Sequence, residues 1–279
     1  MKQEHKDIMK QRKRNICLLV AYDGTNYHGF QRQKPPVVAV QNVLEDKLTK
    51  ICGDTAELAA AGRTDAGVHA TGQVVNFFTD GKIPLDRLPR AVNGLLPPDI
   101  AVLEAQEADF SFSARHSAVS KTYVYYIQTA AVRNPFSGKY AWHIPFALNA
   151  AKMQEALKLL LGKHDFSSFR AAGGADISPI RTLYRSDIVT GKNTVAFILH
   201  GNGFLYHMVR NIVGTAVSVG RGKISVADFA RILDAKDRRL ASPTAPPQGL
   251  FLTNVTYADL KFHRNFSDVS YFLDYRDCR

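Results

Sequence analysis

The chain is poor in cysteine and tryptophan and has no long apolar run. Its three cysteines, Cys17, Cys52 and Cys278, lie far apart, without a Cys-X-X-Cys pair or a His/Cys cluster of zinc spacing. The sequence therefore predicts neither a disulfide framework nor a zinc module, and sparse cysteine is typical of a reducing compartment. No apolar run reaches the ~18 residues that a membrane-spanning helix needs.

The first segment, Met1 to Asn15, lacks the apolar stretch of a secretory signal. We expect residues 1–15 to be a basic tail that is either solvated or makes an additional contact with phosphate. The absence of targeting signals, together with the cysteine usage, favours a cytoplasmic location.

The sequence has fewer acidic than basic residues. It contains 36 Lys and Arg and 25 Asp and Glu, which gives a net charge of +11. A cationic excess suggests a polyanionic partner such as nucleic acid, since cations release counterions when they meet phosphates. A merely soluble basic protein is the alternative. The 46% hydrophobic composition is that of an ordinary globular chain, and 279 residues suit one large domain or two small ones.

Hydrophobic periodicity predicts an alternation of strands and helices. In the first half we expect strands at 16–21, 73–78 and 101–106 and helices at 40–51 and 85–95. In the second half we expect a strand at 121–128, a helix at 150–161, a hairpin of 186–190 with 194–200, helices at 204–219 and 225–233, and a strand at 250–257. This order predicts an α/β or α+β layer with helices on one face.

The second half repeats the element order of the first, which suggests two similar halves. We expect an N-terminal α+β half over residues 16–115, a C-terminal α+β half over 116–260 and a second tail over 261–279. Ligand sites favour the clefts between such halves.

The segment Gly62-Arg63-Thr64-Asp65-Ala66-Gly67-Val68-His69 carries one carboxylate between glycines. An acidic side chain on a stiff turn has the fixed aim that a nucleophile needs. Because residues two apart in an extended segment share a side, Arg63 and Asp65 are expected to face the same substrate. The alternatives are an Asp that bonds its own turn and a surface Arg.

Tyr123 and Tyr125 share one face of the strand predicted at 121–128, and Val124 and Tyr126 share the other. An aromatic ring on such a strand either packs within the sheet or stacks on a nucleobase, a contact worth ~1–3 kcal/mol.

Arg210 lies in an apolar helical stretch, where an unpaired guanidinium is costly to bury. It therefore needs a carboxylate, and Asp65 is the natural candidate, whose charged form it would favour. The alternative is an Arg on the solvated stripe of the helix.

Other polar residues are candidate contacts to RNA or structural groups. Arg170 and Arg181 flank an irregular segment and are expected to touch phosphates, and Thr64 and His69 belong to the Asp65 loop. His69 and His207 lack a third partner at metal spacing, so structural roles are favoured over a metal site.

Four segments together resemble the TruA-type tRNA pseudouridine synthase family, over residues 16–257. They are the octet Gly62–His69, the run Tyr22–Gln33, the basic-X-Tyr-X-Tyr run Lys121–Tyr125 and the stretch Gly203–Gly214. Where family members often carry Trp after the second glycine of the Tyr22–Gln33 run, this chain has Phe30.

The resemblance implies the pseudouridine synthase fold, with two α+β (ferredoxin- or RRM-like) halves and mostly antiparallel sheets around a basic cleft. It implies a homodimer without cofactor or metal, acting on tRNA at uridines 38, 39 and 40 of the anticodon stem-loop. Asp65 corresponds to the essential catalytic residue and Tyr123 to the tyrosine that stacks on the target base.

Such an enzyme flips the uridine out of the stem, at a cost of a few kcal/mol, and Arg63 would enter the gap or steer the nucleotide. Attack of Asp65 on C1′, attack on C6 and a glycal route stay open as mechanisms.

Two other classes of function also remain possible for this sequence. A basic RNA-binding module fits the charge but leaves an Asp amid cations unexplained, and a hydrolase would normally use a pair of carboxylates.

Overall fold

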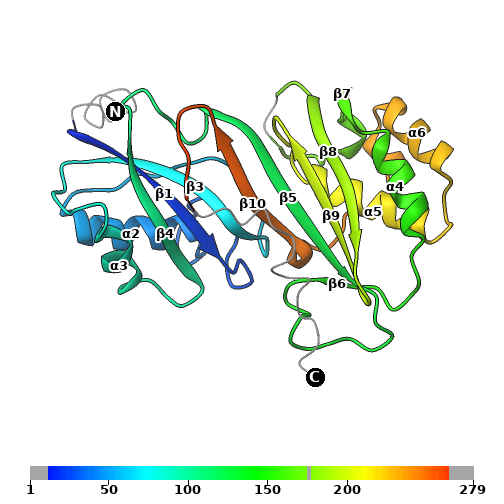
Figure 1. Cartoon of the computed structure of the whole chain (residues 1–279), viewed down its shortest axis with the longest axis horizontal. Coiled ribbons are helices and arrows are strands. Elements are labelled where there is room, and N and C mark those ends of the chain that lie inside the picture. Colours follow the sequence, from blue (N-terminus) through cyan, green and yellow to red (C-terminus); the bar gives the residue numbers. More distant parts are fainter. Residues whose placement is uncertain (1–11, 175–176, 264–279) are drawn as a thin grey trace. The chain divides into compact units, whose positions relative to one another are not determined.

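The computed structural model describes residues 12–174 and 177–263 (Figure 1). The chain forms two compact units. Unit 1 runs to Val119 and resumes at Leu252, and unit 2 runs from Ser120 to Phe251. Both combine helices with mostly antiparallel strands, which confirms the α+β class. Most of the two predicted tails, 1–15 and 261–279, lies outside the described residues.

Unit 1 is built on strands in the order β4 (Ile100–Ala108), β1 (Arg14–Tyr22), β3 (His69–Thr79) and β10 (Leu250–Tyr257), of which β10 starts in unit 2. A two-residue strand, β2 (Ala59–Ala60), also pairs with β3. The predicted strands at 16–21, 101–106 and 250–257 are confirmed. β3 begins four residues before the predicted start at Gln73, because its first residues pair with the end of β1, where Tyr22 lies opposite Ala70.

Two helices, α2 (Val40–Cys52) and α3 (Leu88–Asn93), lie together on one face of the unit 1 strands (Figure 1). Leu44 and Leu48 of α2 are fully buried. The helix ends as predicted at Gly53, whose left-handed backbone lets its N–H bond the carbonyl of Thr49. Helix α3 is shorter than the predicted 85–95, because the chain before it forms a turn on the carbonyl of Pro84.

Unit 2 is built on strands in the order β5 (Ala118–Gln128), β9 (Thr194–Gly201), β8 (Ile180–Thr190) and β7 (Gly162–Asp165), which are antiparallel. The short β6 (Trp142–His143) adds a parallel pairing to β5. The predicted hairpin is confirmed, but β8 starts at Ile180 rather than Ser186. Its first residues pair with β7, a strand too short and too polar to be recognised from periodicity.

Three helices, α4 (Ala150–Lys158), α5 (Met208–Gly220) and α6 (Val226–Ala235), pack against one another in unit 2. Helix α6 begins as predicted at Ser225, whose hydroxyl accepts the N–H of Asp228 while Asp228 accepts the N–H of Ser225. Helix α4 ends three residues before the predicted end, in a turn that leads into β7.

Helix α5 begins at Met208, four residues after the predicted start at Phe204. Residue His207 has a left-handed backbone, with φ of 57°, which interrupts the helix there. The preceding carbonyl, that of Tyr206, bonds the N–H of Ala171 instead of a helical partner. A tertiary contact therefore decides where this helix starts.

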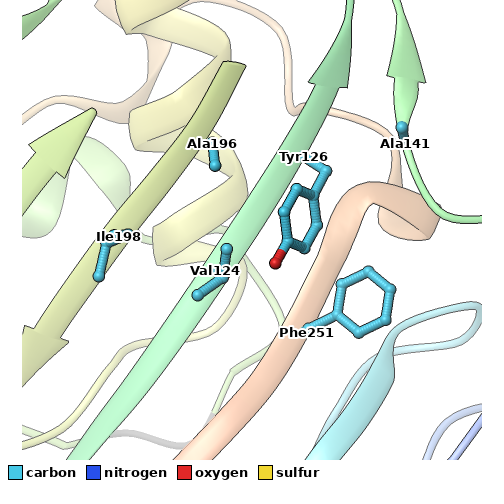
Figure 2. Packing of buried hydrophobic residues seen from close by; sticks show 6 residues of the cluster. All are labelled: Val124, Tyr126, Ala141, Ala196, Ile198 and Phe251. Carbon is cyan, nitrogen blue, oxygen red and sulfur yellow. The ribbon is translucent and has the colours of Figure 1, made fainter. Parts of the chain in front are cut away.

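The strand β5 contributes its two faces to different environments. Val124 and Tyr126 point toward the same buried cluster as Phe251, together with Ala196 and Ile198 of β9 (Figure 2). Tyr125, which belongs to the other face, is fully buried and donates its hydroxyl to the carbonyl of Pro246 over 2.7 Å. The predicted division of the strand into a Val124/Tyr126 face and a Tyr123/Tyr125 face fits this packing.

Candidate active site

Asp65 lies in the loop between β2 and β3, and the backbone of this loop is fixed at several points. The carbonyl of Asp65 accepts the N–H of Val68 over 3.1 Å, which closes a turn. Gly67 has a φ of 75° within this turn and donates its N–H to the carbonyl of Tyr27. The half-buried Asp65 carboxylate therefore stands on a stiff turn in which glycine is required.

The Tyr22–Gln33 segment packs directly against this loop. Phe30 donates its N–H to the carbonyl of Thr64 over 3.1 Å. A Cβ atom at Gly29, whose φ is 84°, would lie 2.7 Å from that carbonyl oxygen, and one at Gly24 would lie 2.0 Å from the carbonyl oxygen of Val68. The two glycines are thus needed for the close approach of two backbone segments, and this approach fixes the Asp65 loop.

The neighbours of Asp65 alternate in exposure. Arg63 is exposed, Thr64 is buried, and Asp65 is half-buried. The Thr64 hydroxyl lies 2.8 Å from the hydroxyl of Tyr22 inside unit 1. The buried Thr64 is therefore flanked by two residues that are less buried than it is.

His69, at the start of β3, is only 1% exposed. Its Nδ1 accepts the N–H of Gly24 over 3.0 Å and lies 3.1 Å from a carboxylate oxygen of Asp23. The bond from Gly24 holds the Asp23-Gly24 turn onto the residue that follows the Asp65 loop. Both contacts favour a structural role for His69, and a contact of this ring with substrate stays a prediction.

Tyr123 lies on β5, opposite Leu199 of β9, and is 8% exposed. Its ring meets the ring of Phe204 edge to face, with the centroids 5.0 Å apart. Strand pairing and this aromatic contact hold the Tyr123 ring in a defined orientation.

Arg210 is one of two residues of α5 that are not buried, the other being Ser218. Its Nε donates to the carbonyl of Ala245 over 2.8 Å. The segment that contains Ala245 approaches α5 closely at Gly214, because this residue has no Cβ. A Cβ there would lie 2.1 Å from the carbonyl oxygen of Pro243. Burial raises the pKa of the nearby Tyr125 above its usual range, and the positive charge of Arg210 opposes this rise.

Arg170 and Arg181 form a pair of neighbouring cations in unit 2. Burial lowers the pKa of Arg181 from its usual value, and the charge of Arg170 adds to this effect. Arg181 donates Nη1 to the carbonyls of Ser178 and Ile180, and Arg170 donates to that of Ile177. Two neighbouring guanidinium groups in one segment suit a phosphate ligand.

The predicted site residues therefore belong to two groups. The first group lies in unit 1, where Arg63, Thr64 and Asp65 share one loop and His69 follows it at the start of β3. The second group lies in unit 2 and consists of Tyr123, Arg170, Arg181 and Arg210. The pairing of Asp65 with Arg210 stays a prediction. In the part of the chain that the structure describes, no group of three or more His, Cys, Asp or Glu residues is arranged to hold a metal ion.

Sequence reasoning missed several residues that support these groups. Tyr22 and Gln73 contact the Asp65 loop, Phe204 contacts Tyr123, and Ala245 holds Arg210. Tyr22 and Phe204 lie within the motifs that carried the resemblance. Gln73 and Ala245 have no local signature, because their roles depend on partners distant in sequence.

Comparison with known proteins gives the family. The model of the family described as tRNA pseudouridine synthase matches residues 18–117 and 156–258. The tRNA pseudouridine synthase A of Thermoanaerobacter sp. (strain X514) is 47% identical over 244 residues, which cover 88% of this chain and 100% of that protein. The proteins of the same name from Geobacillus kaustophilus (47% over 246 residues, 88% and 95%) and Neisseria meningitidis serogroup C (42% over 247 residues, 88% and 93%) are similar.

These matches define an RNA-modifying isomerase. The chain belongs to the tRNA pseudouridine synthase family, which confirms the resemblance drawn from its motifs and places it among enzymes rather than binding modules. A crystal structure of a Cbf5–Nop10–Gar1 complex shares 12% identity over 88% of this chain and 59% of that chain, with a TM-score of 0.36, a likeness too weak to bear on the site. No helix within the described residues is long and apolar enough to cross a membrane.

Proposed function

We propose that this enzyme converts uridine to pseudouridine at positions 38, 39 and 40 of the tRNA anticodon stem-loop, with Asp65 as its catalytic carboxylate. The observation that carries the proposal is the octet Gly62–His69, which presents Asp65 on a turn fixed by Gly67 and by the Tyr22–Gln33 segment. Relatives named tRNA pseudouridine synthase A support tRNA as the substrate. The three positions follow from the family resemblance.

The reaction exchanges one bond to the ribose for another. The N1–C1′ bond breaks, the uracil turns, and C5 bonds to C1′. The hydrogen of C5 leaves as a proton, and N1 carries a hydrogen in the product, so the mass of the RNA does not change. Because the uracil must stay in place while it is detached, the enzyme has to hold the base and the sugar separately.

Asp65 is proposed to act as the nucleophile on the flipped nucleotide. A carboxylate fixed on a stiff turn loses little freedom when it meets the reacting sugar, and such positioning contributes strongly to rate. The rigid backbone around Asp65, with its bonds to Val68 and its neighbour Thr64 bound to Phe30, supports this role.

Arg210 is proposed to be the ion-pair partner that keeps Asp65 charged and aimed. This proposal is supported by the hydrogen bond from Arg210 Nε to the carbonyl of Ala245, which restricts the orientation of the guanidinium. A guanidinium fixed at one nitrogen presents its remaining N–H groups in a set plane, which suits a carboxylate.

Tyr123 is proposed to stack on the uracil while the base turns and to help remove the C5 proton. Its orientation is maintained by β5 and by the edge-to-face contact with Phe204. Stacking on an aromatic ring uses the π-face of the base and no particular hydrogen-bond pattern, so it can hold the uracil while the base is detached.

The remaining contacts are proposed to hold the tRNA. Arg63, the exposed neighbour of the Asp65 loop, would enter the stem or steer the everted nucleotide, and Arg170 with Arg181 would bind phosphate. Thr64 and His69 would complete the substrate side of the loop. We further propose a homodimer without a metal or cofactor, as the resemblance implies, and a cytoplasmic location, which the cysteine usage favours.

The proposal is tested by tritium release from tRNA labelled at uridine C5, because isomerisation must expel that hydrogen. Wild-type enzyme is expected to release tritium from transcripts with uridine at positions 38 to 40 and not from transcripts without it. Asp65→Asn is expected to fold, bind tRNA and release none. The control is Asp109→Asn, since Asp109 is also a turn carboxylate of unit 1 and accepts the N–H and the hydroxyl of Ser111, two residues away. Normal release by Asp65→Asn rejects the proposal.

A further inference from the structure

A buried chain of hydrogen bonds lies behind the Asp65 loop within unit 1. Gln73 of β3 donates Nε2 to the carbonyl of Gly62 over 2.8 Å, and its Oε1 accepts the N–H of Gly62 over 3.3 Å. The same Nε2 lies 3.4 Å from the hydroxyl of Tyr22, which in turn lies 2.8 Å from the hydroxyl of Thr64. The chain thus links the end of β1 and the middle of β3 to both neighbours of Arg63.

These groups are removed from water. Gln73 is 0% exposed, Tyr22 is 4% exposed and Thr64 is 7% exposed. A buried polar group that loses its partner costs more free energy than a partnered one contributes. Because water cannot replace these partners, the loss of any one of these hydrogen bonds would leave a buried polar group unpaired.

Tyr22 makes two of these bonds, and the donor is fixed in only one of them. The amide nitrogen of Gln73 can only donate, so the Tyr22 oxygen accepts from it, whereas either hydroxyl can be the donor between Tyr22 and Thr64. Burial raises the pKa of Tyr22 to about 12, which keeps this hydroxyl protonated at neutral pH.

These bonds fix Gly62 and Thr64, which lie directly before Arg63 and Asp65. Gly62 is held through its backbone and Thr64 through its side chain, and the Thr64 carbonyl is held by the N–H of Phe30. Gly62 and Thr64 are therefore held toward the interior of unit 1, while Arg63 between them is exposed and Asp65 beyond them is half-buried.

We propose that Tyr22 and Gln73 are positioning residues that set the aim of the Asp65 carboxylate through Thr64 and Gly62. The inference rests on the proposed catalytic role of Asp65 and adds to it a buried support that touches no substrate. Loss of the support is expected to lower the rate of the chemical step while leaving tRNA binding intact, since small displacements of a reacting group cost large factors in rate.

Tyr22→Phe tests this with Tyr257→Phe as the matched control. Both tyrosines are 4% exposed and belong to unit 1, and each hydroxyl is hydrogen-bonded, that of Tyr257 to the carbonyl of Ala114 over 2.8 Å. Single-turnover tritium release and KM for tRNA are measured for both variants, with the thermal midpoint of each. Tyr22→Phe is expected to lower the single-turnover rate by about tenfold or more with KM unchanged, and Tyr257→Phe to change neither.

A second pair removes the amide without relying on Tyr22. Gln73→Met keeps the length of the side chain and loses its bonds to Gly62, and Asn76→Leu removes a buried amide of the same strand that bonds Asn15 and Ala114 instead. Gln73→Met is expected to share the rate defect of Tyr22→Phe, and Asn76→Leu to retain the wild-type rate in its folded fraction.

The outcomes separate the two levels of the argument. If Asp65→Asn turns over normally, the proposed function fails and the inference fails with it. If Asp65→Asn is inactive while Tyr22→Phe and Gln73→Met react at the wild-type rate, only the positioning role is rejected. Equal rate losses in Tyr22→Phe and Tyr257→Phe, or a raised KM with unchanged rate in Tyr22→Phe, also overturn it, since they indicate general destabilisation or a direct contact with tRNA.

Discussion

Arg210 and Ala245 are joined by a reciprocal pair of hydrogen bonds. The Arg210 side chain donates Nε to the carbonyl of Ala245 over 2.8 Å, and the N–H of Ala245 donates to the carbonyl of Arg210 over 3.1 Å. Ala245 is fully buried. The plane of the guanidinium is therefore set by backbone atoms of a neighbouring segment, and its orientation depends on the planar fork of arginine.

Arg210→Lys is expected to slow the reaction although it keeps the positive charge. A lysine has no Nε–H fork with which to bond the Ala245 carbonyl and present further N–H groups in one plane. We expect the single-turnover rate to fall by about 10²-fold with little change in KM for tRNA. Arg221→Lys, at the other end of α5 where Arg221 packs over Phe146, is the control and is expected to keep the wild-type rate. Equal rates for the two variants would reject the geometric role of Arg210.

Gly29→Ala is expected to destabilise the protein more than Gly53→Ala. Both glycines have a left-handed backbone, with φ of 84° and 76°, so both substitutions introduce strain of roughly 1–2 kcal/mol. A Cβ at Gly29 would also meet the Thr64 carbonyl at 2.7 Å, whereas a Cβ at Gly53 would meet no atom within 4 Å. Urea unfolding should show an additional loss of about 1–3 kcal/mol for Gly29→Ala, from overpacking against backbone.

The same pair separates stability from catalysis. Because Gly29 faces the backbone beside Asp65, Gly29→Ala should slow tritium release by the folded enzyme, and Gly53→Ala should not. Equal stability and equal rates for the two variants would contradict the close approach of the two backbone segments.

Stability is expected to fall at alkaline pH. Burial raises the pKa of Tyr22 to about 12 and raises those of Tyr125 and Tyr257 beyond their usual range. In the unfolded chain these hydroxyls lose their protons near pH ~10. The folded state then binds more protons than the unfolded state, so stability is complete below about pH 10 and decreases as the pH rises through the folded values.

Tyr22→Phe should remove one of these contributions. Between pH 10 and 12, unfolding free energy from urea titrations is expected to fall less steeply in the variant than in the wild type, by about 1.4 kcal/mol per pH unit. An identical slope for both proteins would show that the Tyr22 hydroxyl ionises in the folded state as it does in the unfolded chain.

Arg181→Gln is expected to weaken tRNA binding in a salt-dependent way. If Arg181 meets a phosphate, its removal should raise KM, leave the single-turnover rate nearly unchanged and reduce the slope of log K against log salt by about 1. Arg239→Gln is the control, because Arg239 is exposed in unit 2 and is ion-paired with Asp237 over 2.6 Å. An unchanged slope for Arg181→Gln would show that this cation does not meet the RNA backbone.

The elements that were predicted well are those with local signals. Helix α2 has an apolar stripe and ends at Gly53, and helix α6 begins at the Ser225–Asp228 capping box. The strands β1 and β10 are rich in apolar and β-branched residues. Such signals depend on neighbours within a few residues, so they are present in the sequence whatever the rest of the chain does.

The family and the candidate residues Asp65, Tyr123 and Arg210 could be predicted from short motifs, and the α+β class followed from the family resemblance. The start of α5, the extent of β8 and the contacts that hold the Asp65 loop could be read only from the folded protein. Tyr206 meets Ala171, β7 pairs with β8, and Gln73 bonds Gly62 across 11 positions. A hydrogen bond between distant residues leaves no periodic pattern, since its geometry exists only once the backbone segments have been brought together.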